Sequence, residues 1–128
     1  MTAAKVVDAS ALVAVLFGEP DADRVAERLE GGRLFAPPLL EYEISNVCVV
    51  KCRRHPADRA AILAAFSKRA LFGIQEVGVD SEALTTVALD SGLTAYDASY
   101  LLLSQELGAE LVTLDEALGR AASVVVRR

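Results

Sequence analysis

The segment KVVDASALVAVLFGEP, residues 5–20, decides the fold class of this chain. Its first part, Lys5–Asp8, is short and rich in valine, which predicts a buried strand. Ser10 is expected to cap a helix that extends to about Phe17, where Gly18-Glu19-Pro20 ends it. A strand that passes into a helix begins a crossover connection, and such connections join parallel strands. The segment therefore predicts an α/β fold built on a parallel sheet.

The same alternation of strands and helices continues along the chain, and turn residues separate the elements. Further strands are predicted at Leu34–Ala36, Ile74–Val77, Glu110–Leu114 and Val124–Val126. Further helices are predicted at Asp21–Glu30, Leu39–Arg54, Ala57–Ala70, Ser81–Ser91, Thr94–Leu107 and Glu116–Ala122. This order favours a parallel sheet with helices on both faces. In such folds, ligands bind beyond the carboxyl ends of the strands.

Length and composition predict one domain, residues 1–128, with a core that needs no disulfide or structural metal. The chain has 128 residues, of which 53% are apolar and 24% charged. Its longest apolar stretches, such as Ala9–Phe17 with Ser10 inside it, are shorter than the roughly 18 residues of a membrane span, and Asp8 argues against a signal peptide. We therefore expect a soluble cytoplasmic protein without a membrane partner. Cys48 and Cys52, four residues apart on a helix, are expected to be core residues.

Charge is segregated along the chain, although the net charge of −5 argues against binding nucleic acid through bulk charge. From residue 74 to residue 118 there are nine acidic residues and no lysine or arginine. Two interpretations stay open for the cations of residues 51–69: solvated helix faces, or a surface that binds phosphates. These cations are Lys51, Arg53, Arg54, Arg59, Lys68 and Arg69.

Two predicted strands end in aspartate, at Asp8 and Asp115. In a parallel sheet, both carboxylates lie at the same edge. Each aspartate also precedes a helix, where it can act as an N-cap that accepts hydrogen bonds from free backbone amides. The pattern alone leaves both roles open.

Two further acids, Glu43 and Asp97, are expected on the apolar faces of their helices. Glu43 has Leu39, Leu40 and Val47 three or four positions away. Asp97 has apolar neighbours at the same spacings and no basic residue nearby in sequence. Burying an unpaired charge costs several kcal/mol, so these carboxylates need a cation. A structural arginine is one candidate, and a divalent cation such as Mg²⁺ or Mn²⁺, which prefers clusters of carboxylate oxygens, is the favoured one.

Four sequence motifs resemble those of PIN-domain ribonucleases, specifically the VapC toxins of bacterial and archaeal toxin–antitoxin pairs. The motifs are VVDASAL (residues 6–12), PLLEYEISN (38–46), LTAYDASY (93–100) and LVTLD (111–115). Each is weak alone, but four in this order within one short chain are specific. The resemblance implies a three-layer α/β/α fold with a central parallel sheet.

The resemblance also implies an endoribonuclease that depends on Mg²⁺ or Mn²⁺. By it, Asp8, Glu43 and Asp97 hold the metal, with Asp115 as a fourth catalytic acid. Ser10 and Thr113 match small hydroxyl positions near the site, and Asn46 matches an asparagine one turn beyond the motif glutamate. The implied partners are an RNA substrate and a cognate antitoxin, and we also expect a homodimer. We assign RNA binding to Lys51, Arg53, Arg54 and Arg59.

Two alternatives belong to other functional classes. A receiver-type phosphoacceptor domain has a similar fold and length, but it needs a lysine near its last strand, and residues 74–118 contain none. A catalytically inactive PIN-like binding module is disfavoured because all four acids are present.

For the antitoxin, we expect a docking surface on the apolar residues of two helices: Val13, Leu16, Phe17, Val49 and Val50.

Overall fold

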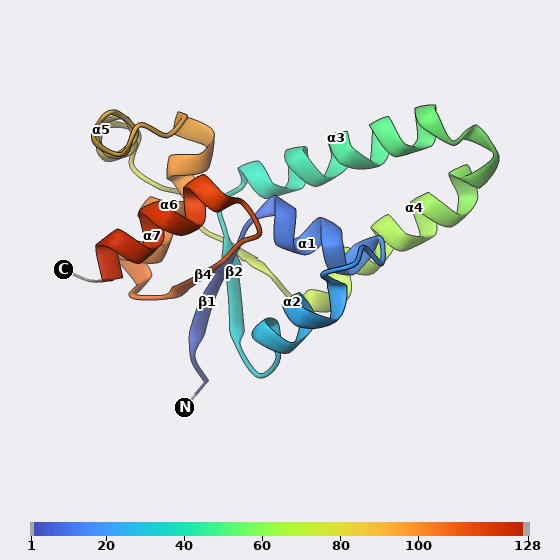
Figure 1. Ribbon diagram of the computed structural model, residues 1–128, viewed down its shortest axis with the longest axis horizontal. Coiled ribbons are helices and arrows are strands. Elements are labelled where there is room, and N and C mark those ends of the chain that lie inside the picture. The colour runs from blue at the N-terminus through green and yellow to red at the C-terminus, as the bar shows by residue number, and fades with distance from the viewer. Residues whose placement is uncertain (1, 127–128) are drawn as a thin grey trace.

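The computed structural model describes residues 2–126, and side chains as far as residue 123. Four strands form one parallel sheet (Figure 1). They are β1 (Ala4–Val7), β2 (Arg33–Ala36), β3 (Gln75–Glu76) and β4 (Glu110–Val112), in the spatial order β3-β2-β1-β4. The prediction of an α/β fold with a central parallel sheet is confirmed.

The strand order creates a switch point between β1 and β4. From β1 the chain adds β2 and β3 on one side, and it then crosses back to place β4 on the other side of β1. Val7 of β1 is in register with Val112 of β4. The connections therefore leave in opposite directions from the carboxyl ends of these two strands, which is where ligands bind in open α/β sheets.

Seven α-helices are described, and they cover both faces of the sheet. In Figure 1, α1 and α2 lie on one side of the sheet and α6 and α7 on the other. The helices α3 and α4 form a hairpin that projects away from the sheet (Figure 1). The bounds are α1 (Ala9–Leu16), α2 (Ala22–Leu29), α3 (Leu39–Arg54), α4 (Arg59–Ser67), α5 (Ser81–Ser91), α6 (Ala95–Leu107) and α7 (Glu116–Val126), with 3₁₀ turns η1 (Pro56–Asp58) and η2 (Lys68–Phe72).

Helix α6 is the centre of the core. Every residue from 98 to 104 is buried, and the helix packs against β1, β4, α5 and α7. Thr94 caps its first turn by accepting a hydrogen bond from the Asp97 amide at 3.1 Å. Gly108 ends it in the left-handed region, at φ 59°, which a residue with a Cβ adopts only at a cost. These two ends fix where Asp97 enters the carboxyl edge of the sheet.

Three local predictions were wrong. The N-cap of α1 is Asp8, whose carboxylate accepts the Ala11 amide, because Ser10 already lies inside the first turn. The helix predicted at 57–70 is divided into η1, α4 and η2, since short 3₁₀ turns are common at helix ends. The strand predicted at Val124–Val126 is the end of α7. Three valines lower helix propensity by only tenths of a kcal/mol each, too little to end a helix that has already formed.

The apolar surface predicted on α1 is also wrong. Val13 and Leu16 are buried, and the Lys51 ammonium lies 5.0 Å from the centre of the Phe17 ring. On α3, by contrast, Val49 and Val50 are exposed. Cys48 is buried, as expected for a core residue, whereas Cys52, also expected in the core, is only half-buried, and neither forms a disulfide. None of the helices described has both the length and the apolar character to cross a membrane.

Candidate active site at the carboxyl edge of the sheet

Asp8 is the buried acid at the switch point. It follows β1 directly, and its amide donates to the Val112 carbonyl of β4 at 3.2 Å. Only 4% of the residue is exposed. Oδ1 accepts the Ser10 hydroxyl at 2.7 Å and the Ala11 amide at 3.0 Å, and Oδ2 accepts the Thr113 hydroxyl. These bonds hold both oxygens in place and leave the carboxylate little freedom to move.

The hydroxyls of Ser10 and Thr113 link the first turn of α1 to the loop that follows β4. Besides donating to Asp8, Ser10 accepts the Leu114 amide at 2.9 Å, and Thr113 accepts the Asp115 amide at 3.0 Å. The two hydroxyl oxygens lie 3.4 Å apart. The structure thus places both residues against Asp8, where they support its carboxylate.

Glu43 reaches the same edge from α3. It is half-buried, and its Oε1 accepts a hydrogen bond from the hydroxyl of Tyr100 on α6. Burial raises the pKa of Glu43, the Tyr100 hydrogen bond opposes this, and the charges of Asp97 and Asp8 raise the pKa further. Burial and the neighbouring Glu43 raise the pKa of Tyr100 as well, so its hydroxyl stays protonated and remains a donor.

Asp97 and Asp115 lie at the starts of α6 and α7. Asp97 is the third residue of α6, after the Thr94 cap. Asp115 caps α7 by accepting the Leu118 amide at 2.8 Å, as its sequence position allowed. Burial and then the charge of Asp115 raise the pKa of Asp97, while Thr94 lowers it. Only the Asp115 carboxylate caps a helix, and that bond leaves it with free lone pairs that a cation could use.

The four carboxylates lie within electrostatic reach of one another. Asp8 has a raised pKa because of burial, and the charge of Asp115 adds to the effect of burial despite three opposing hydrogen bonds. Among the residues described, the ion pairs involve other acids and none neutralises Asp8, Glu43, Asp97 or Asp115. The cluster therefore carries uncompensated negative charge.

The donor set fits a hard divalent cation, although the side chains do not form a closed coordination shell. In the described part of the chain, no three His, Cys, Asp or Glu side chains lie close enough together to hold a metal ion as they stand. Like charges repel, so carboxylates without a cation between them are expected to stay apart. The oxygen ligands themselves are of the type that Mg²⁺ and Mn²⁺ select.

Burial raises the pKa of Asp8, so keeping its carboxylate ionised in the folded protein lowers the free energy of unfolding by an amount that depends on pH. Between the ordinary and raised pKa values, the folded state holds more protons than the unfolded state, so stability falls as pH rises. The metal-free Asp8→Asn variant should therefore exceed the wild type in unfolding free energy by an amount that grows with pH. We expect a clear difference in unfolding free energy at pH 7.5 and a small one at pH 4, measured by urea denaturation. A difference that stays constant or shrinks as pH rises would contradict this.

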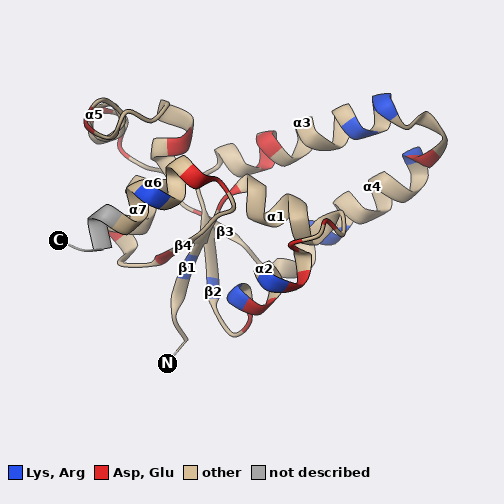
Figure 2. Cartoon of the chain, in the orientation of Figure 1, with Lys and Arg blue, Asp and Glu red and all other residues tan. Residues whose placement is uncertain are grey.

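The remaining predicted residues lie outside this cluster. Asn46 is exposed on α3, one turn beyond Glu43, and no described hydrogen bond links it to the carboxylates. Lys51 is half-buried beside Phe17 and forms an ion pair with Glu19 at 3.6 Å. Arg53, Arg54 and Arg59 are exposed at the outer end of the α3–α4 hairpin. Figure 2 shows the basic residues at that end, apart from the acidic starts of α6 and α7.

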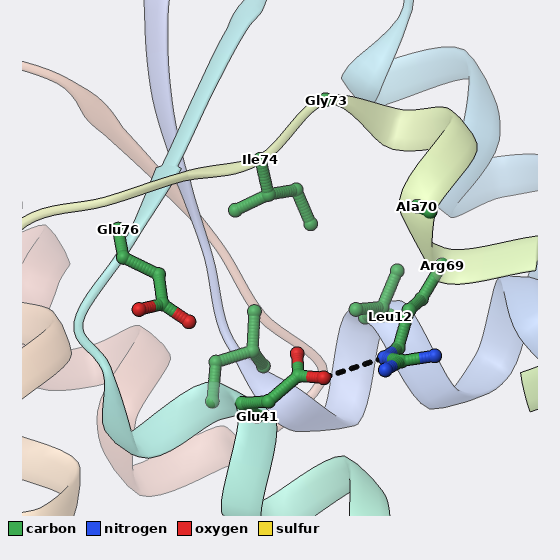
Figure 3. Close-up of a pocket in the computed structure, with 8 residues that line it drawn as sticks. Leu12, Glu41, Arg69, Ala70, Gly73, Ile74 and Glu76 are labelled. Carbon is green, nitrogen blue, oxygen red and sulfur yellow. Dashed lines mark hydrogen bonds and ion pairs between the residues drawn. The ribbon is translucent and has the colours of Figure 1, made fainter. Parts of the chain in front are cut away.

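A separate cavity of about 220 Å³ lies between α3, η2 and β3, and none of the four carboxylates lines it (Figure 3). Within it, Arg69 donates to Glu41 at 2.7 Å and lies 3.9 Å from the centre of the Phe66 ring. Glu41 is therefore satisfied by an arginine, unlike Glu43 two residues later. On α3, Glu41 is therefore a structural acid, whereas Glu43 is a candidate functional acid.

Tyr100 is a site residue that the sequence analysis did not identify. Its only sequence signal is its position three residues after Asp97, which places the two on the same side of α6. Its partner Glu43 is 57 residues away, so the hydrogen bond could not be inferred without the fold.

Comparison with known proteins shows the family to which the chain belongs. The family model of the PIN domain matches residues 5–124. The chain belongs to the PIN domain family. It is 32% identical to Ribonuclease VapC3 of Pyrobaculum aerophilum, over 94% of this chain and 96% of that protein. It is also 32% identical to Ribonuclease VapC9 of Mycobacterium tuberculosis, over 86% of this chain and 84% of that protein.

The crystal structure of PAE2754 from Pyrobaculum aerophilum has the same fold as this PIN domain. The two superpose with a TM-score of 0.77 and 28% sequence identity, over 99% of this chain and 96% of the other. The resemblance to PIN-domain VapC ribonucleases, drawn from four short motifs, is thereby confirmed. The α/β/α fold that it implied is confirmed as well.

Proposed function

We propose that this PIN domain is an endoribonuclease and the toxin of a toxin–antitoxin pair. Its site would be the four carboxylates Asp8, Glu43, Asp97 and Asp115 with Mg²⁺ or Mn²⁺. One observation supports the proposal: burial and the charges of these acids raise the pKa of Asp8, Glu43 and Asp97 near the carboxyl ends of β1 and β4, and no described cation neutralises the four. Similarity to ribonucleases along nearly the whole chain supports the same activity.

The residues around the site favour attack by water over attack by a protein nucleophile. The Ser10 and Thr113 hydroxyls are occupied as donors to Asp8 and as acceptors of backbone amides. His55, the one histidine, is exposed at the outer end of the hairpin. A bound divalent cation would polarise the scissile phosphate and lower the pKa of a water molecule. The protein would hold Asp8 rigid and position Glu43 through Tyr100.

Cleavage of RNA by the purified protein is the direct test. We expect single-stranded RNA to be cut internally with Mg²⁺ or Mn²⁺ and to stay intact with EDTA, and cleavage to return when the metal is restored. If neither metal supports cleavage of any RNA offered, the inactive binding module becomes the better account. A receiver domain is excluded, since the chain belongs to another family.

Metal binding should also be visible without catalysis. A cation that binds only the folded state stabilises it by about 2.7 kcal/mol at a concentration 100 times its dissociation constant. We expect Mn²⁺ and Mg²⁺, but not K⁺ at matched ionic strength, to raise the melting temperature. The rise should be smaller in Asp8→Asn and in Asp97→Asn. An equal rise in both variants would place the metal elsewhere.

Removing the Tyr100 hydroxyl should change the pH dependence of activity. The hydrogen bond from Tyr100 lowers the pKa of Glu43, so Tyr100→Phe should let Glu43 take up a proton at higher pH. We expect kcat/KM to fall about tenfold at pH 6 and much less at pH 8, because a hydrogen bond to a charged group contributes about 1.5–3 kcal/mol. An equal loss at every pH would mean that Tyr100 acts through packing alone.

The antitoxin is the proposed protein partner. Val49, Val50 and Leu63 are exposed on the α3–α4 hairpin, and these apolar side chains could receive an amphipathic segment. A basic side chain of that segment would be attracted to the uncompensated carboxylates. Neutralising Asp8 or Asp97 should then weaken inhibition as well as catalysis. Equal binding of an antitoxin peptide to wild type and to both variants would separate inhibition from the acidic site.

A further inference from the structure

Two exposed tyrosines lie next to two of the candidate site acids. Tyr42 precedes Glu43 on α3 and Tyr96 precedes Asp97 on α6, and their exposed fractions are 76% and 66%. The other aromatic side chains are at least half-buried; among them, Tyr100 is 1% and Phe35 7% exposed. The two strongly exposed aromatic side chains therefore belong to residues that directly precede candidate site acids. Their Cα atoms are about 3.8 Å from those of the acids.

The helix segments that carry these tyrosines contain no basic residue, and Arg69, which lies beside Glu41 next to Tyr42, is paired with that carboxylate. Helix α6 contains no lysine or arginine, and those of α3 lie in its last turn. Glu43 and Asp97 themselves repel phosphates. A divalent cation at the site would attract the scissile phosphate, so the nucleotides on either side of it would gain from a further attraction that is not electrostatic. An aromatic ring supplies one, because every base has a face that can stack on it.

We propose that Tyr42 and Tyr96 are base-stacking platforms that hold unpaired nucleotides of the substrate at the acidic site. This rests on the proposed ribonuclease function and adds two residues that would hold the substrate at the site. Bases inside an A-form duplex are stacked on each other and cannot reach a side chain, whereas bases in loops and single strands can. Stacking on the two tyrosines therefore requires unpaired bases and depends little on base identity at the stacked positions.

Crosslinking tests the contact directly, without catalysis. The probe is a single-stranded RNA of mixed sequence that carries 5-iodouridine, bound to the full-length Asp8→Asn protein and irradiated with long-wavelength ultraviolet light. We expect crosslinked peptides that contain Tyr42 and Tyr96. An identical RNA annealed to its complement should crosslink much less. Crosslinks confined to other residues would overturn the proposal.

Substitutions separate stacking from other roles of the two rings. Tyr42→Ala and Tyr96→Ala, in an otherwise native chain, should each raise KM for single-stranded RNA about tenfold and leave the melting temperature unchanged. Tyr42→Phe and Tyr96→Phe should keep the wild-type KM, because the ring remains. Leu71→Ala, at an 84% exposed residue on η2, is the control and should change neither value.

The outcomes distinguish this proposal from the function on which it rests. Normal cleavage with unchanged KM in both alanine variants overturns the stacking proposal and leaves the ribonuclease intact. Unchanged KM with weaker inhibition by the co-encoded antitoxin assigns the tyrosines to the protein partner and also overturns it. If the wild type binds and cuts no RNA, the proposed function fails and the stacking proposal fails with it.

Discussion

Asp8→Asn is expected to lower the rate of RNA cleavage about 1,000-fold or more while the fold stays intact. Asp8 is the most buried of the four acids, and three hydrogen bonds fix both of its oxygens. Asparagine keeps the shape and an oxygen acceptor but removes the charge that would bind the cation. Loss of several kcal/mol of charge stabilisation in the transition state corresponds to three or more powers of ten in rate. The measurement is single-turnover cleavage at saturating metal.

The control for this variant is Asp90→Asn, which removes one carboxylate at an exposed position of α5. It should cleave at the wild-type rate. Circular dichroism and urea denaturation then establish that Asp8→Asn is folded. A folded Asp8→Asn protein that cleaves within a few-fold of the wild type would remove Asp8 from the catalytic site.

Most of the fold could be predicted because turn residues and hydrophobic periodicity divide the chain clearly. The sequence did not predict the strand order β3-β2-β1-β4, since nothing local states which strands pair. It also misplaced the cap of α1. Asp8 and Ser10 are both good capping residues, and the choice depends on where β1 stops, which its pairing with β4 decides.

The sequence predicted the site residues that can be recognised from their neighbours on one helix. It did not predict a contact between two segments that are far apart in the chain. Apolar neighbours along one helix were enough to suggest that Glu43 and Asp97 point inward, and both are half-buried. Tyr100 could not be recognised as the partner of Glu43, because a buried tyrosine on an apolar helix face is usually a core residue. Lys51 matched the basic cluster in sequence, yet its contacts with Phe17 and Glu19 arise only in the folded protein.

Reversing the charge of the hairpin end should reduce RNA affinity about 100-fold at low salt. Arg53, Arg54 and Arg59 are exposed there, whereas Lys51 is held by Glu19 and is left unchanged. We assume that each arginine neutralises one phosphate of a single-stranded RNA. In the triple glutamate variant, the slope of log K against log salt should then be less steep by about 0.7 for each contact that is lost. The total change in slope is then about 2, measured by fluorescence anisotropy in the Asp8→Asn background.

The triple glutamate variant should weaken RNA binding far more than it slows the cleavage step. Along α3, Arg54 is about 16 Å from Glu43 at 1.5 Å per residue, too far to act on the bond that is cut. We therefore expect KM to rise and kcat to stay within a few-fold of the wild type. Reversing Arg24, Arg33 and Arg120, which are exposed elsewhere, makes the same change in net charge and is the matched control. If that control weakens binding equally and flattens the slope equally, the effect belongs to overall charge and the hairpin end is only a solvated surface.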